Sequence, residues 1–145
     1  MKARNGRIVI GIGCRKQCYV GEIIELVHTA LEKSDIAISD VAIIATPWVK
    51  NDAEPIIHTA EALDLPLVVI PKERCEEVAN LAQTVSQKVV ELFAVPSIAE
   101  VAALAAAGKN PRLVCARITS GGASCAIAIG DCDLEETNPA SGFVV

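Results

Sequence analysis

Residues 8–18, IVIGIGCRKQC, constrain the fold of this chain more than any other stretch. The apolar start at 8–12 is typical of a buried strand. It runs into a glycine turn with two cations, GCRK at 13–16, and a helical pattern opens near Val20. This arrangement is typical of an anion-binding site, because backbone N–H groups and the positive end of the helix point outward together. The stretch lacks the third glycine of a dinucleotide fingerprint and the Gly-Lys-Ser/Thr of a P-loop.

Size and composition narrow the class of protein. The 145 residues suit one domain, and with 52% hydrophobic but only 3% aromatic residues the core must be aliphatic. The net charge of −5 argues against a general nucleic-acid partner. The polar N-terminus and the lack of a long apolar run predict a cytoplasmic protein without signal peptide or membrane span.

Strand and helix patterns alternate along the chain. Strands are predicted at 7–13, 41–45, 67–70, 113–118 and 124–129, and helices at 20–33, 54–63, within 73–92 and at 97–107, the last with a Ser97-x-x-Glu100 capping box. The alternation predicts a three-layer α/β/α domain with a mixed, mostly parallel sheet of about five strands. The link at 119–123 is too short for a parallel crossover, so the last two strands should form an antiparallel hairpin. Residues 1–145 are expected as one domain, with 131–145 a loosely held polar tail.

Ligands of open α/β sheets bind beyond the carboxyl ends of the parallel strands. That edge should collect 13–17, 46–52, 71–74 and the turn 119–123, with cationic side chains near two glycine turns. A cradle for several carboxylates or phosphates is one interpretation. Two tight turns with exposed basic residues is the other. The predicted ligand residues are Gly11, Gly13, Cys14, Arg15, Lys16, Lys50, Arg117, Ser120, Gly121, Gly122 and Ser124.

Three residues are candidates for catalysis, each with a plainer alternative. Cys14 lies beside two cations near a helix start, which favours a thiolate nucleophile, but a small side chain filling a turn is the preferred interpretation. Asp52 or Glu54 could act as a general base, although stabilising the start of the next helix is the preferred role. The six cysteines are expected to be mostly reduced and buried, and their spacing predicts no metal site or cofactor.

Four ordered blocks carry a family resemblance over almost the whole chain. They are GIGCRK at 11–16, KNDAEP at 50–55, PSIAEVAAL at 96–104 and RITSGGASCAIA at 117–128. Together they resemble the CobE / CbiG C-terminal domain family of cobalamin biosynthesis, and most closely its stand-alone members, since no additional N-terminal domain is seen. Gln17 stands where the family has glycine, and Arg117 where it has lysine.

The resemblance implies a role in making the corrin ring, whose intermediates are tetrapyrroles bearing many acetate and propionate groups. One implied function is a non-catalytic carrier or chaperone that holds a precorrin or hydrogenobyrinate-like intermediate through Arg15, Lys16, Lys50 and Arg117. The alternative is a hydrolase that opens a corrinoid lactone with loss of acetaldehyde, with Asp52 or Glu54 activating water. A third possibility is a partner of another cobalamin-pathway enzyme.

Overall fold

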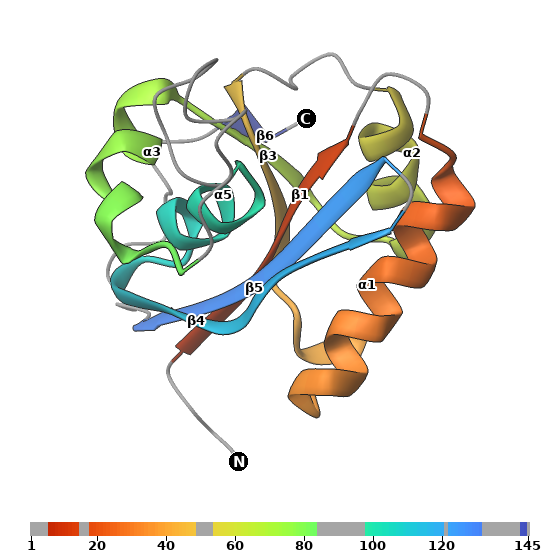
Figure 1. Ribbon diagram of the computed structural model, residues 1–145, viewed down its shortest axis with the longest axis horizontal. Helices are drawn as coiled ribbons and strands as arrows, with labels where there is room; N and C mark the ends of the chain where they lie inside the picture. Colours follow the sequence, from red (N-terminus) through yellow and green to blue (C-terminus); the bar gives the residue numbers. More distant parts are fainter. Residues whose placement is uncertain are drawn as a thin grey trace.

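The computed structural model describes residues 6–14, 18–48, 54–83, 98–120, 122–131 and 143–144. These residues form a six-stranded sheet with helices on both faces (Figure 1). The strands are β1 Gly6–Cys14, β2 Ile43–Pro47, β3 Leu67–Ile70, β4 Lys109–Ser120, β5 Ala123–Asp131 and β6 Phe143–Val144. Their order in the sheet is β4-β5-β1-β2-β3-β6. The predicted three-layer α/β/α fold with a mixed sheet is confirmed.

The pairing directions bring the ends of several strands to one edge of the sheet. β1, β2 and β3 are parallel, whereas β5 is antiparallel to both β1 and β4. β4 therefore runs in the same direction as β1, and β1 to β4 all end at the same side of the sheet. We call this side the carboxyl edge. The turn between β4 and β5 lies there, as the predicted antiparallel hairpin requires.

Helices α1 Val20–Ser34 and α2 Glu54–Leu63 cover one face of the sheet, and α3 Lys72–Glu77 and α5 Ile98–Ala106 cover the other (Figure 1). Two short 3-10 turns, η1 Ile38–Asp40 and η3 Ala79–Leu81, complete the helical segments of the described chain. No helix in the described part of the chain is long and apolar enough to cross a bilayer.

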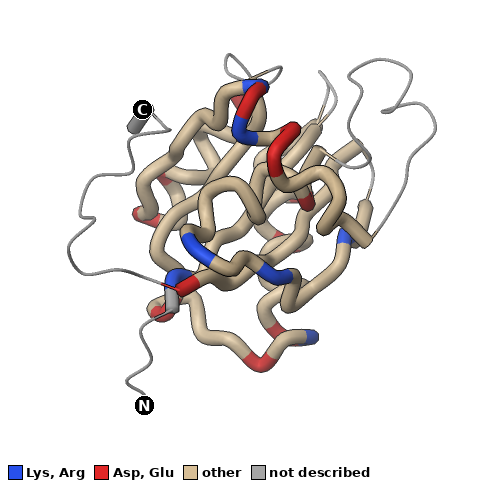
Figure 2. The backbone as a smooth tube through the Cα atoms, turned by 90° about the vertical axis from the view of Figure 1, so that its left-hand side faces the viewer, with Lys and Arg blue, Asp and Glu red and all other residues tan. Residues whose placement is uncertain are grey.

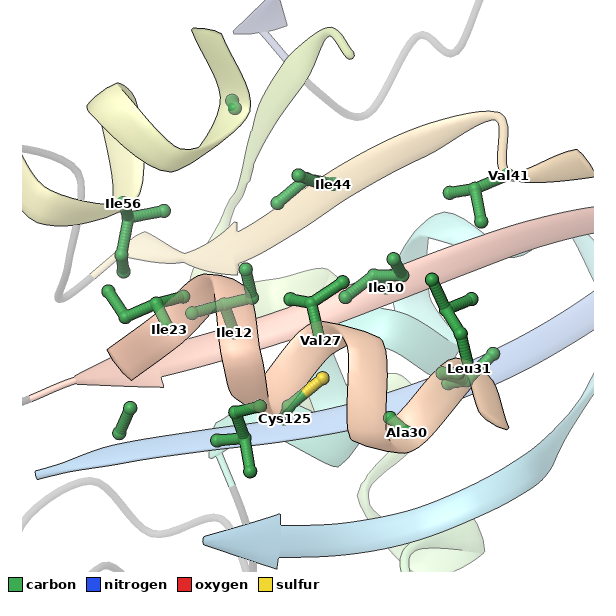
Figure 3. Packing of buried hydrophobic residues seen from close by; sticks show 14 of the residues in the cluster. Ile10, Ile12, Ile23, Val27, Ala30, Leu31, Val41, Ile44, Ile56 and Cys125 are labelled. Atoms are coloured by element: carbon green, nitrogen blue, oxygen red, sulfur yellow. The ribbon is translucent and has the colours of Figure 1, made fainter. Parts of the chain in front are cut away.

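Large aliphatic side chains fill the space between α1 and the sheet (Figure 3). Successive residues of a strand point to opposite faces, so the even-numbered residues of β1 point toward α1. The apolar stripe of α1 packs against them at helical spacing. The buried residues at this interface include Ile10, Ile12, Ile23, Val27, Leu31 and Cys125.

Helix α5 lies much closer to the sheet, because glycines and alanines face it. A Cβ atom at Gly11 would lie 2.1 Å from the carbonyl oxygen of Ala99, and one at Gly130 would lie 2.2 Å from that of Ala107. Real side chains cannot approach a backbone oxygen this closely. The two glycines therefore allow the α5 segment to rest directly on β1 and β5.

Two arginines bind the carboxyl end of α5. The guanidinium of Arg7 donates to the carbonyl of Ala106 at 3.2 Å, and that of Arg74 donates to the carbonyl of Ala105 at 2.8 Å. The last carbonyls of a helix lack intrahelical partners and carry partial negative charge, so cations are favourable there. These bonds hold α5 at the end of the sheet opposite to the carboxyl edge.

Some predicted boundaries differ from the structure. β2 lies two residues later than the predicted 41–45, and its Thr46 hydroxyl donates to the carbonyl of Ile12 at 3.0 Å. β4 extends beyond the predicted 113–118 at both ends. Within the predicted tail, Phe143–Val144 pairs with β3 as β6.

Candidate functional site at the carboxyl edge

The exit of β1 and the start of β5 lie side by side at the carboxyl edge. Gly13 pairs with Ser124, and Cys14 pairs with Ala123, in the last two steps of the antiparallel ladder. The hydroxyl of Ser124 donates to the carbonyl of Gly13 at 3.5 Å. The turn between β4 and β5 therefore lies directly beside the point where β1 leaves the sheet.

Helix starts approach this edge from both faces. α1 follows β1 after a short connection, and the start of α5 lies against the end of β1, where a Cβ at Gly13 would lie 3.1 Å from Cγ2 of Ile98. α2 begins at Glu54, after the connection from β2. Each helix start carries N–H groups without intrahelical partners and a partial positive charge. The carboxyl edge is thus suited to a ligand with several negative charges.

Two glycines of β1 were predicted as ligand residues, and Gly13 was also predicted to begin a glycine turn. Gly11 and Gly13 lie within the strand, paired with Ala126 and Ser124, and neither has a positive φ angle. The predicted turn therefore does not begin at Gly13, because the strand continues to Cys14, and the rest of that turn, 15–17, lies outside the described residues. Gly11 is required by the close approach of α5, and its selection as a ligand residue stays a prediction.

Arg117 differs from the other arginines that the structure describes. The side chains of Arg7, Arg74 and Arg112 each donate to a carbonyl or pair with a carboxylate. The guanidinium of Arg117 makes no hydrogen bond or ion pair with the described residues, and the residue is half-buried. It lies three positions before Ser120, the last residue of β4. An arginine with a free guanidinium near the edge can bind a carboxylate in a bidentate manner.

The backbone of Arg117 is bound by a buried acid. Glu100 of α5 is fully buried, and one of its carboxylate oxygens accepts a hydrogen bond from the N–H of Arg117 at 2.8 Å. Its other carboxylate oxygen accepts from the N–H of Gln83, also at 2.8 Å. The sequence predicts Glu100 only as part of a capping box, whose other member, Ser97, lies outside the described residues. The signal for its burial was a single acid in the otherwise apolar run IAEVAALAA.

The remaining predicted residues divide into two groups. Ser120 is exposed at the end of β4, Gly122 lies half-buried in the turn, and Ser124 is half-buried beside Gly13. The others, Arg15, Lys16, Lys50, Asp52 and Gly121, lie outside the described residues, and their roles stay predictions. Gln17 and Cys132 lie outside as well.

The catalytic candidates that are described favour their plainer roles. Cys14 is buried in the aliphatic cluster under α1, where a thiol acts as a small apolar side chain. Glu54 is exposed in the first position of α2, where a carboxylate stabilises the helix start. The five described cysteines are buried thiols outside disulfides, as predicted. Burial raises the pKa of Cys75 to about 12 despite the nearby Arg74, and it raises the pKa of Cys125 further.

The charge distribution agrees with a local site rather than a broad basic surface. On the face drawn in Figure 2, both basic and acidic positions of the described chain occur, and neither sign covers the whole face. Salt bridges of α3 join Lys72 to Glu76 and Arg74 to Glu77. Within the described residues, no three His, Cys, Asp or Glu side chains are grouped so that they could hold a metal ion.

Comparison with known proteins decides the family. Residues 8–128 match the family model described as cobalamin synthesis G C-terminus. The chain belongs to this family. The match contains β1 from Ile8 onward, all of β4 and β5 up to Ala128, so the β1 exit and the β4–β5 turn both lie within the family domain. The protein is accordingly a cobalamin biosynthesis protein of the CobE/CbiG type.

Individual relatives agree with this assignment. Protein CobE from Sinorhizobium sp is 26% identical over 121 residues, which cover 83% of this chain and 79% of that protein. The crystal structure of CobE, a protein from the cobalamin (vitamin B12) biosynthetic pathway, superposes with a TM-score of 0.79 at 23% identity, covering 86% of this chain and 90% of the other. Cobalamin biosynthesis protein chiG from Agrobacterium tumefaciens gives a TM-score of 0.67 at 34% identity, covering 87% of this chain and 99% of that one.

Proposed function

We propose that this protein binds a polycarboxylate tetrapyrrole intermediate of corrin biosynthesis at the carboxyl edge and acts as its carrier. The observation that carries the proposal is the pairing of Gly13 with Ser124 and of Cys14 with Ala123. This pairing joins the β1 exit, which continues into Arg15 and Lys16 in the sequence, to the β4–β5 turn.

The charges near this edge match the chemistry of the proposed ligand. Acetate and propionate groups around a tetrapyrrole are spread over its rim, so they need several separate cations and N–H donors rather than one deep pocket. The Arg117 guanidinium has no partner among the described residues, and Arg15, Lys16 and Lys50 follow strand ends that lie at the same edge. The family membership supports a corrin intermediate over other polyacids.

An exposed aromatic ring adds a second kind of contact. Tyr19, directly before α1, has a relative exposure of 73%, the largest among the exposed large hydrophobic residues that the structure describes. Aromatic rings at a surface stack on flat conjugated ligands at little entropic cost. A macrocycle at this edge would therefore meet cations along its rim and an aromatic ring against its face.

Titration with hydrogenobyrinic acid, a metal-free corrin polycarboxylate, tests the proposal. We expect a saturable shift in the visible absorption spectrum of the pigment. Replacing two cations, as Arg15→Ala with Lys16→Ala, should weaken binding at least tenfold, because each lost charge-assisted bond contributes roughly 1.5–3 kcal/mol.

The matched control removes two cations from the opposite edge, as Lys33→Ala with Arg112→Ala. Lys33 lies in the last turn of α1, and Arg112 pairs with Asp131 near the start of β4. This variant has the same net charge as the first and should bind like the wild type. No spectral shift with the wild type, or equal losses in both variants, contradicts the proposal. Release of acetaldehyde from a corrinoid lactone would instead identify a hydrolase.

A further inference from the structure

Glu100 is an unusual residue for the middle of a core. Its side chain has no exposure to solvent, and the other buried residues of α5 are alanine, valine and leucine. Ionisable side chains are almost never fully buried unless they are paired. The carboxylate of Glu100 meets this condition with two backbone N–H groups, one from Gln83 and one from Arg117. One side chain thereby joins α5 to two segments that are distant in sequence.

The Arg117 N–H is available to Glu100 because β4 is irregular at this point. Cys115 pairs with Ile127 and Ile118 pairs with Cys125, so two residues of β4 lie opposite the single residue Ala126. A bulge of this kind adds a residue to one strand and leaves a backbone group outside the ladder. The carboxylate of Glu100 accepts the hydrogen bond that the ladder does not supply at Arg117.

A regular strand would not need this acid. Burying a carboxylate costs several kcal/mol of desolvation, whereas a regular β4, which is an edge strand, would pair its inward N–H groups with carbonyls of β5 and leave the outward ones to water. A bulge near a binding site redirects a side chain relative to the regular strand. The side chain at this bulge is Arg117, the described arginine whose guanidinium has no partner within the described residues.

We infer that Glu100 is a positioning residue for the ligand. It holds the bulge at Ala116 and Arg117, and the bulge sets the direction in which the Arg117 guanidinium meets a ligand carboxylate at the carboxyl edge. This inference rests on the proposed function, since it assigns one contact of the same site. Glu100 itself does not touch the ligand.

A double-mutant cycle tests this role with hydrogenobyrinic acid as the probe. Glu100→Gln keeps the size of the side chain but replaces one acceptor oxygen by an NH₂ group, and Arg117→Gln removes the guanidinium. We expect each single variant to bind about tenfold more weakly than the wild type, as for the loss of one charge-assisted bond. The double variant should bind no more weakly than Arg117→Gln alone, because Glu100 acts through Arg117.

Arg74→Gln is the control for general loss of stability in α5. It removes a hydrogen bond from the other end of the same helix, to the carbonyl of Ala105, and leaves Glu100 and Arg117 intact. It should lower the melting temperature without changing the affinity. Losses of affinity that add in the double variant, or an equal loss with Arg74→Gln, overturn the inference.

If the Glu100→Gln variant does not fold, two further measurements still test the inference. Glu100→Asp keeps the charge but withdraws it by one methylene, and it should show the same non-additivity with Arg117→Gln. In the wild type, the Nε–H resonance of Arg117 should shift on addition of the probe while that of Arg112 stays unchanged. If the protein binds the probe but the Arg117 resonance does not shift, the inference about Glu100 is wrong and the proposed function still stands. A wild type that does not bind the probe overturns the proposed function, and this inference with it.

Discussion

The two faces of the sheet differ in how closely their helices pack against the strands. Toward α1, the central strands present isoleucines such as Ile10, Ile12 and Ile127, and the helix is held away from the sheet by interlocking side chains. Toward α5, the same strands present Gly11, Ala128 and other small residues. At Gly11 and Gly130 the backbone of the sheet lies directly against the backbone of the α5 segment, with no space for an added atom.

This difference predicts which face of the sheet tolerates substitutions that change the size of a side chain. A core of interlocking aliphatic side chains adjusts when a methyl group is lost, although at a cost. A backbone contact cannot move aside for an added atom, because the atoms that it meets belong to the chain itself. Glu100 lies on α5 and binds the backbone of Arg117. A displacement of α5 should therefore also displace the bulge at Arg117 and change the carboxyl edge.

The largest effect should come from Gly11→Ala. The added Cβ would meet the carbonyl oxygen of Ala99 at 2.1 Å and the Ala103 nitrogen at 2.8 Å, so α5 would have to leave the sheet. We expect a loss of about 3 kcal/mol or more in the free energy of unfolding, measured by urea denaturation. Gly21→Ala is the control, because nothing lies within 4 Å of a Cβ there. It should stabilise α1 by about 0.5 kcal/mol.

A smaller but clear loss is expected for Ala103→Val in α5. Ala103 is fully buried and its Cβ lies under β1 at Gly11, so two added methyl groups have no space. Overpacking of this kind should cost roughly 2 kcal/mol. The same replacement at the exposed Ala62 of α2 should cost only about 0.5 kcal/mol, from helix propensity. Equal losses of stability for Ala103→Val and Ala62→Val would show that α5 is not closely packed against the sheet.

On the α1 face, Ile23→Val removes one methylene from a fully buried side chain. We expect a loss of about 1 kcal/mol, because the neighbouring aliphatic side chains close part of the space. The comparison between the faces is then quantitative: adding carbon atoms at Ala103 should cost more than removing one at Ile23. If chemical denaturation shows a larger loss of stability for Ile23→Val than for Ala103→Val, the contrast between the two faces is wrong.

The smallest effect is expected away from both faces, at the exposed end of β5. A hydrogen bond from Asn110 is the largest cause that lowers the pKa of Asp131, and Arg112 lowers it further. A carboxyl whose folded pKa is lowered stabilises the protein above its unfolded pKa, and this contribution is lost as the pH falls through the folded pKa. Asn110→Ala and Arg112→Gln should each raise the pKa of Asp131. Carboxyl titration by NMR measures this pKa, and an unchanged value in either variant would contradict the assignment of its cause.

Local patterns predicted much of this fold. The bounds of α2 and β3 follow from proline positions and apolar runs, and the structure has them as predicted. The hairpin followed from the shortness of the link at 119–123. β2 was placed too early, because Thr46 and Pro47 suggested a loop. A long-range bond from the Thr46 hydroxyl to Ile12 keeps this segment in the sheet.

The candidate site was predictable only in its position. The order of strands implied that the β1 exit and the last hairpin share one edge, and the pairing of Gly13 with Ser124 agrees. The role of Gly11 depends on how closely α5 approaches, which no local pattern contains. The bulge at Arg117 and its bond to Glu100 join residues 17 positions apart, and neither residue signals this bond alone.

The most direct test of the ligand site is amide chemical-shift mapping with ¹⁵N-labelled protein and hydrogenobyrinic acid. We predict shifts at Cys14, Cys18, Ser120 and Ala123, which lie at or next to the carboxyl edge, and none at Asp35 or Lys109 at the opposite edge. Saturable shifts confined to the opposite edge, or to the exposed side of β4, would contradict a ligand site at the junction of β1 and the hairpin.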